Sequence, residues 1–219
     1  MKLKIIKPKV FIESKFNSGK LLKNLERYGR VCYKSENKIT PNSARKFLAT
    51  ILKSGHESVI EHEKITVRVI CDRGVTHEIV RHRIGSYSQE STRYCNYKSR
   101  GIKAIKPFFF TDKKKYKVWL KAMIDCETAY NKLIELGANP QEARSVLPNS
   151  LKTEIIITYN LREWRHFFKL RCSRKAHPQM REIAISLLRK FQNRIPVIFD
   201  NFMITEDKTL SYPFYIKQL

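Results

Sequence analysis

The alternation of apolar and polar side chains predicts two half-buried strands. Over residues 64–71 the period is two, and the apolar face holds Ile65, Val67, Val69 and Cys71. Residues 151–159 contain the β-branched run Ile155-Ile156-Ile157-Thr158, which favours a strand there as well. A third strand is predicted over residues 3–12, where Pro8 suits a sheet edge.

Apolar residues at helical spacing predict most of the remaining elements. The expected helices cover residues 20–32, 40–52, 75–84, 115–136, 161–170 and 178–193, with a short one through Ala143 and Val146. The helix over 115–136 has an apolar stripe made of Tyr116, Trp119, Leu120, Met123, Tyr130, Leu133 and Ile134.

End signals support these helices. Thr40 to Ser43 carry cap-type residues, Gly55 follows the second helix, Asn160 precedes the fifth, and Pro178 occupies a first turn. Residues 85–101 have no usable periodicity and are expected to form an ordered loop. We therefore predict a single α+β domain over residues 1–219, with an antiparallel or mixed sheet and several long helices.

The charge changes this picture, because 44 Lys and Arg against 20 Asp and Glu give a formal net charge of +24. Such an excess indicates an anionic partner, or simply a lysine-rich surface. The arginines are more informative: of 17, six lie within 68–100 and eight within 144–194, with none over 101–143. Their planar forks suit phosphates and carboxylates, so two distant segments are expected to build anion sites.

The cellular compartment and the state of the cysteines are predicted from sequence signals that the chain lacks. The chain has no apolar run near the roughly 20 residues that span a bilayer, and residues 1–7 do not resemble a signal peptide. The five cysteines form no CxxC pair, so we expect reduced and mostly buried thiols in a cytoplasmic protein.

Several familiar sites are excluded. The segment from His77 through Glu78 to His82 is one residue too long for the HExxH zinc motif, which places its histidines on different helix faces. A metal is therefore not expected. The chain also lacks GxGxxG, P-loop and GxSxG motifs.

The densest chemistry lies in residues 81–94, RHRIGSYSQESTRY. Its guanidinium and hydroxyl groups suit phosphates, and its Gln and Glu suit the polar edge of a pyrimidine. By composition alone the segment also suits a solvated basic loop.

The order of these residues resembles the signature of the flavin-dependent thymidylate synthases. Further matching segments stand in family order: Gly55-His56-Glu57-Ser58 with Glu61-His62, Ala143-Arg144 with Leu147-Pro148, the run Asn160-Leu-Arg162-Glu-Trp-Arg-His166, and Leu170-Arg171. The resemblance covers most of residues 55–182 and implies the family's fold.

The resemblance also implies roles for particular residues. Those implied to contact FAD are Ser58, Arg81, His82, Arg83, Gln89, Asn160, Arg162 and His166. Those implied to bind dUMP are Glu78, Arg81, Gln89, Glu90, Ser91, Thr92, Arg93, Arg144 and Arg171. Two are implied in catalysis: Arg171 favours ionisation of the uracil N3, and His56 lies near folate and flavin. Ser91 has no evident general base beside it and is assigned to binding.

The implied reaction methylates dUMP, with methylene-tetrahydrofolate as carbon donor and FAD, reduced by NADPH, as hydride source. The implied assembly is a homotetramer with active sites between subunits. Ser88-Gln89 and Glu78 depart from common family versions, which leaves the contacts to the uracil edge and ribose open.

Two other functions fit the same features. A basic nucleic-acid-binding module would explain the charge, although no RNP, KH or zinc-finger pattern is present. The other is a different flavoprotein that uses the same fold to methylate another uracil, such as one in RNA. Single histidines such as His62, His77 and His166 are also compatible with structural roles, and Arg162 and Arg165 with a helix surface.

Overall fold

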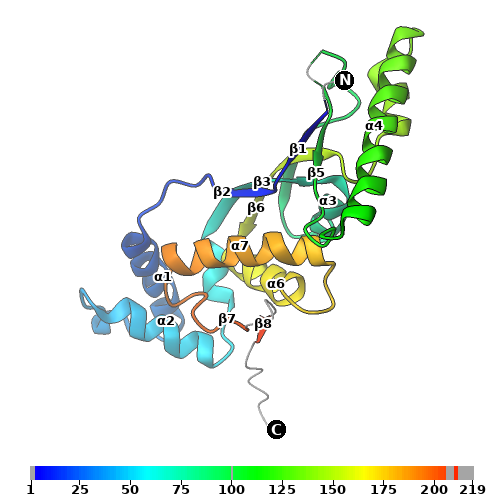
Figure 1. Cartoon of the computed structure of the whole chain (residues 1–219). Helices are drawn as coiled ribbons and strands as arrows, with labels where there is room; N and C mark the ends of the chain where they lie inside the picture. The colour runs from blue at the N-terminus through cyan, green and yellow to red at the C-terminus, as the bar shows by residue number, and fades with distance from the viewer. Residues whose placement is uncertain (1–2, 100, 206–209, 212–219) are drawn as a thin grey trace. The chain divides into compact units, whose positions relative to one another are not determined.

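The computed structural model describes residues 3–99, 101–205 and 210–211 and has the expected α+β class (Figure 1). The strands are β1 Lys4–Ile6, β2 Lys9–Ile12, β3 Lys64–Asp72, β4 Ser86–Gln89, β5 Lys103–Ile105, β6 Lys152–Asn160, β7 Met203–Ile204 and β8 Leu210–Ser211. The α-helices are α1 Ser18–Cys32, α2 Ser43–Lys53, α3 Arg73–Ile79, α4 Lys113–Glu135, α5 Pro140–Ala143, α6 Leu161–Arg171 and α7 Pro178–Arg194. Short 3-10 helices are η1 Glu36–Lys38, η2 Ser58–His62 and η3 Arg144–Val146.

The main sheet has four strands in the order β2-β3-β6-β4. Both predicted half-buried strands occupy its centre, and alternate residues from Ile65 to Cys71 are buried as expected. Separately, β1 pairs in parallel with β5, and β7 pairs antiparallel with β8. The described chain divides into two compact units that each take part of β3 and part of β6. The single domain over 1–219 stays a prediction.

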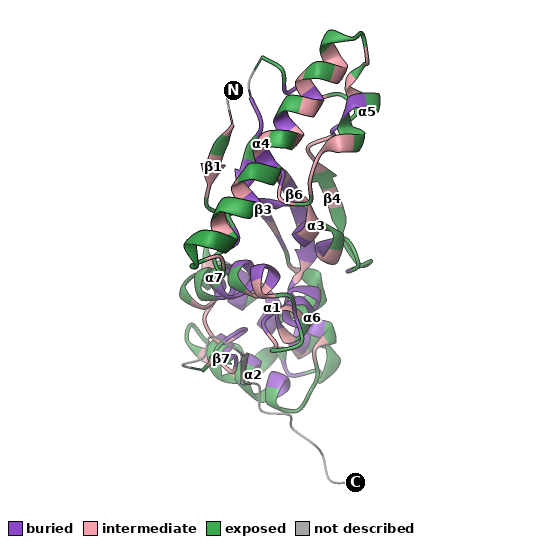
Figure 2. Cartoon of the chain, turned by 45° about the vertical axis from the view of Figure 1, so that its right-hand side comes forward, coloured by how far each residue is buried: buried purple, intermediate pink, exposed green. Residues whose placement is uncertain are grey.

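The first unit draws on residues 1–10, 68–81 and 87–156. Its core joins Trp119, Met123 and Tyr130 of α4 to Ile102 and Ala104, which confirms the predicted stripe. The opposite side of α4 is exposed (Figure 2). Phe110 packs against this core, whereas Phe108 and Phe109 stay exposed.

The second unit draws on residues 11–67, 82–86 and 157–219. Its centre is an aromatic cluster made of Tyr159, Trp164, Phe167, Phe168, Phe191, Phe199 and Phe202. Trp164 is fully buried, and its indole N–H donates to the carbonyl of Ile65 at 3.0 Å. This bond fixes α6 against β3 within the unit, and α7 packs beside α6 (Figure 1).

Several sequence-based expectations are wrong in detail. The strand predicted over 3–12 is split at Pro8 into β1 and β2, because proline cannot donate to a ladder. The helix expected to reach Ile84 ends at Ile79, and the segment after it turns to bury His82. Residues 85–101 contain the strand β4, whose polar side chains gave no period-two signal. The thiols are free, but only Cys71 and Cys172 are buried.

No helix among the described residues combines the length and apolar content that crossing a bilayer requires.

Candidate active site

A pocket of about 500 Å³ opens in the second unit. Three residues predicted to contact flavin line it: Asn160, Arg162 and His166. The rest of the lining consists of Glu57, Glu61, Ile84, Glu163 and Lys169. The volume falls within the range of roughly 300–1,000 Å³ that small-molecule sites occupy. The structure thus brings residues from η2, the segment after α3 and α6 to one concave surface.

The first turn of α6 places Asn160 and Arg162 at this pocket. Asn160 caps the helix, and its Oδ1 accepts from the backbone N–H of Glu163 at 2.8 Å. Arg162 is exposed and pairs with Glu61, which raises the pKa of its guanidinium. Exposed pairs of this kind contribute roughly 0–1 kcal/mol, so an anionic ligand can replace Glu61 at little cost.

Arg165, three residues further along α6, has a different environment. Its side chain is only 1% exposed and donates through Nε to Glu57 Oε1 at 2.9 Å. It also donates to the carbonyl of Ile198 and to Asn201. Arg165 is therefore not a surface charge: it ties η2 and the segment after α7 to the helix.

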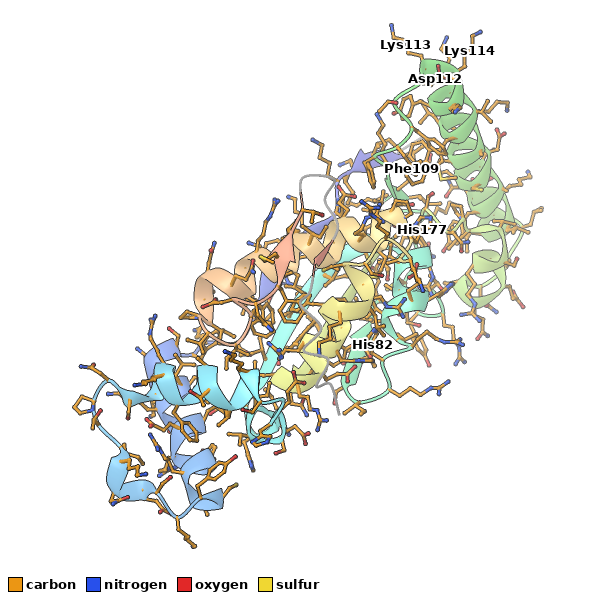
Figure 3. The ribbon with its side chains drawn as sticks, turned by 90° about the horizontal axis from the view of Figure 1, so that it is seen from below. His82, Phe109, Asp112, Lys113, Lys114 and His177 are labelled. Atoms are coloured by element: carbon orange, nitrogen blue, oxygen red, sulfur yellow. The ribbon has the colours of Figure 1, made fainter. Side chains whose placement is uncertain are left out.

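The centre of the site is a chain of hydrogen bonds through His82. The Nε–H of Arg171 donates to His82 Nε2 at 3.0 Å, and His82 Nδ1 lies 2.8 Å from Glu163 Oε1. A guanidinium has no acceptor, so Nε2 must carry the lone pair and Nδ1 the proton. Figure 3 labels His82 beside α6, which contributes both of its partners.

Burial and charge keep His82 neutral. Burial, then the charge of Arg171 and then His166, lower the pKa of His82 to about 4. Burial raises the pKa of Glu163. The pKa of His166 is lowered by burial and by the charges of Lys169 and Arg171. At neutral pH the His82–Glu163 contact is therefore a hydrogen bond from a neutral imidazole.

The same atoms have metal-like spacing, because the ligand atoms of His82, Glu163 and His166 lie within 4.8 Å of one another. However, both ring nitrogens of His82 are already hydrogen-bonded, and the cations of Lys169 and Arg171 act on the cluster. A divalent cation would be repelled by these charges. We interpret the cluster as a hydrogen-bond network, and the expected lack of a metal stays a prediction.

In the first unit, Gln89 at the end of β4 is held by two threonines. Its Nε2 donates to Thr76 Oγ1 at 3.0 Å and to Thr153 Oγ1 at 3.2 Å. Both threonines are buried, so the amide plane is fixed and its oxygen points away from the two threonine hydroxyls. Such an oxygen is suited to accept from an N–H or hydroxyl group of a ligand.

Glu90 is held as firmly. Its Oε2 accepts from Lys152 Nζ at 2.7 Å and its Oε1 from the Tyr97 hydroxyl at 3.1 Å. Burial and the Glu90 carboxylate raise the pKa of the Tyr97 phenol. Beyond Glu90, Thr92 is buried and Arg93 is exposed. Ser91 Oγ accepts from the Arg93 backbone N–H at 3.3 Å. This loop is thus organised by its own polar groups.

The other predicted site residues lie on the surface of their units. In the second unit His56, Ser58 and Arg83 are exposed, and His56 Nδ1 is 2.7 Å from the Tyr33 hydroxyl. In the first unit Arg81 and Arg144 are exposed and Glu78 is partly buried. Most predicted flavin contacts therefore belong to the second unit, and most predicted dUMP contacts belong to the first.

Sequence reasoning gave no site role to the other lining residues, which are Glu57, Glu61, Ile84, Glu163 and Lys169. Glu163 stands three residues after the cap Asn160, a position where glutamate usually signals only a helix start. Its partner His82 is 81 residues away in sequence, so no local pattern could have indicated the contact.

Comparisons with known proteins agree with these motifs. The model of the family described as "Thymidylate synthase complementing protein" matches residues 20–197. A flavin-dependent thymidylate synthase of Geobacter sulfurreducens is 38% identical over 178 residues, covering 78% of this chain and 77% of that one. That of Pyrococcus furiosus is 37% identical over 171 residues, covering 76% and 70%.

The fold is shared with a solved structure. The UMP/dUMP methylase PolB from Streptomyces cacaoi, bound with 5-Br dUMP, superposes with a TM-score of 0.76 at 23% identity. The match covers 90% of this chain and 95% of the methylase chain. The family match over residues 20–197 and the two synthase relatives from Geobacter and Pyrococcus establish that the chain belongs to the flavin-dependent thymidylate synthase family.

Proposed function

We propose that this chain catalyses the reductive methylation of dUMP to dTMP. Methylene-tetrahydrofolate would supply the carbon, and FAD reduced by NADPH would supply the hydride. The observation that carries the proposal is the α6 pocket, where predicted flavin contacts meet the buried network that holds Arg171.

The pocket residues fit a flavin. Asn160 offers an amide, Arg162 and Lys169 offer cations for a diphosphate, and Ile84 offers an apolar side chain. Of the acidic lining, Glu61 is engaged by Arg162 and Glu57 by Arg165 and Lys169, so these carboxylates are already paired. Bound flavin would supply hydride chemistry that no side chain provides.

The residues of the chain would bind, orient and polarise. A guanidinium beside the uracil N3–H favours loss of that proton, because the positive charge stabilises the anion. Arg171 is assigned this role. Gln89, with its amide plane fixed, would accept a hydrogen bond from the nucleotide, and Arg93 and Arg144 would contact its phosphate. Cys71 and Cys172 are poor candidates for a nucleophile, because burial raises the pKa of their thiols and disfavours the thiolate.

We also propose that the protein is a homotetramer with active sites between subunits, as the family resemblance implies. The placement of most predicted flavin contacts in one unit and most predicted nucleotide contacts in the other is compatible with sites assembled from different copies.

The test is release of tritium from dUMP labelled at C5, with FAD, NADPH and methylene-tetrahydrofolate present together and then omitted in turn. We expect release only when all three are present. Arg171→Ala should abolish it, whereas the matched control Lys114→Ala, at the exposed start of α4 (Figure 3), should not. Folded, flavin-loaded protein that releases no tritium would refute the proposal.

A further inference from the structure

The network through His82 connects three charged or titratable side chains, all within the second unit. Glu163 and Arg171 come from opposite ends of α6, and His82 is the buried residue of the otherwise exposed turn after α3. The His82 ring also packs against Phe167 and Tyr159, with centroids 5.1 Å and 6.1 Å away. A planar ring clamped in this way has a fixed direction for each of its two nitrogens.

We propose that Glu163 and His82 are positioning residues for Arg171. The Glu163 carboxylate accepts the Nδ1–H of His82 and so selects one tautomer, and the lone pair that this leaves on Nε2 accepts from Arg171 Nε. That bond sets the plane of the guanidinium. The inference rests on the proposed function, because Arg171 is the residue assigned to polarise uracil.

The order of the bonds makes the tautomer essential. If Nε2 carried the proton, it would face the Nε–H of Arg171 as a second donor, and the two groups would repel. Charge alone does not orient a guanidinium, whereas a hydrogen bond to Nε does so, since all three nitrogens lie in one plane. Glu163 therefore acts on Arg171 through His82.

The groups that face His82 are Arg171, His166 and Glu163 from α6 and the Tyr159 ring from β6. Of these, Arg171 and His166 favour the neutral ring, and burial does so most strongly. The pKa of His82, lowered to about 4, keeps Nε2 free of a proton throughout the pH range in which the enzyme would work.

A pair of substitutions separates positioning from simple core stability. In His82→Gln the amide oxygen can take the place of Nε2 and accept from Arg171. In His82→Asn the shorter amide takes the place of Nδ1, which keeps a partner for Glu163 and loses the acceptor for Arg171. Both side chains are neutral amides, so they differ mainly in which neighbour they reach.

We expect His82→Asn to lower kcat by roughly 10- to 100-fold at saturating FAD, with the KM for dUMP changed less than about threefold. His82→Gln should keep most of the activity. A purely structural role predicts the reverse order, because asparagine preserves the bond to Glu163. Equal kcat values for the two variants, or a higher value for His82→Asn, would overturn the proposal. Circular dichroism and flavin absorbance would verify that both are folded and loaded.

The connection to Arg171 has its own test. Lysine has no guanidinium and so no Nε–H for His82 to orient. In an Arg171→Lys background, His82→Asn should therefore cause little further loss of kcat. Full additivity of the two substitutions would mean that His82 acts elsewhere.

One measurement does not depend on turnover and so distinguishes failure of this inference from failure of the proposed function. In protein with 15N-labelled histidine, the His82 resonances should show a neutral ring protonated at Nδ1 between pH 5 and 8. In Glu163→Leu, which offers Nδ1 no acceptor, the Nε2-protonated tautomer should gain population. A wild-type ring protonated at Nε2, or at both nitrogens at pH 7, would refute the network even if dUMP is methylated. The expected tautomer in a protein without synthase activity would instead refute only the proposed function.

Discussion

At the scale of single residues, two arginines three positions apart on α6 have opposite environments. Arg162 is exposed and pairs with Glu61, whereas Arg165 is 1% exposed and is held by Glu57, Asn201 and the Ile198 carbonyl. Its guanidinium also lies over the Phe202 ring, 5.0 Å from the centroid. Desolvation makes such a group costly to leave unpaired, so its partners matter far more than those of Arg162.

We therefore expect Arg165→Ala to destabilise the protein by roughly 3–5 kcal/mol, since it leaves Glu57 without its buried partner. Arg162→Ala should cost at most about 1 kcal/mol. Urea denaturation of both variants, followed by far-ultraviolet circular dichroism, gives the comparison. Similar losses in the two would mean that Arg165 is not the structural tie that its burial indicates.

At the scale of elements, α6 has two tasks. Its apolar side, with Trp164 and Phe168, packs into the aromatic core, and its other side presents Asn160, Arg162 and His166 to the pocket. Asn160 serves both tasks, because its side chain caps the helix and its position lines the pocket. A substitution at Asn160 can therefore affect helix stability, ligand binding or both.

Two substitutions at Asn160 separate these tasks. Asn160→Ala should cost about 1 kcal/mol of stability, because the N–H of Glu163 loses its acceptor. Asn160→Asp should keep the cap and the stability, since a carboxylate at a helix N-terminus is favourable. The aspartate should nevertheless weaken FAD binding, because it adds negative charge where an anionic cofactor is proposed. Thermal denaturation and flavin titration measure the two effects, and unchanged FAD affinity in Asn160→Asp would remove this residue from the proposed site.

At the scale of the whole molecule, the net charge of +24 must attract anions in general. Long-range attraction of this kind is screened within about 10 Å at 0.1 M salt. It would raise the encounter rate with nucleotides, folates and nicotinamide cofactors, all of which carry negative charge. It would also produce unspecific binding to nucleic acid, which is the main competing function.

The salt dependence of binding distinguishes the proposed enzyme from a nucleic-acid-binding protein. We expect binding of unrelated oligonucleotides to lose roughly 10³–10⁵ in affinity between 50 and 200 mM salt, as for contacts to six to ten phosphates. Binding of dUMP should weaken much less, because it has one phosphate. Fluorescence anisotropy and equilibrium dialysis measure these affinities. An oligonucleotide whose sequence-specific binding survives 200 mM salt would favour a nucleic-acid function instead.

The sequence by itself determined the elements and the family. Period-two burial from Ile65 to Cys71, the stripe on α4, and the ends set by Asn160 and Pro178 all appear as predicted, because they depend on local geometry and capping. The ordered motifs around residues 81–94 and 160–171 indicated the family without any contact being known.

Only the tertiary structure decided which polar residues are buried and with whom. The polar strand β4 forms because of its neighbour in the sheet, and its own sequence carries no strand signal. Likewise, Arg162 and Arg165 look alike in sequence, and the network from Glu163 through His82 to Arg171 joins segments over 80 residues apart. The physical reason is desolvation, because a buried charge or imidazole is stable only where distant segments supply its partners. The spacing of residues in the sequence does not show which distant segments come into contact.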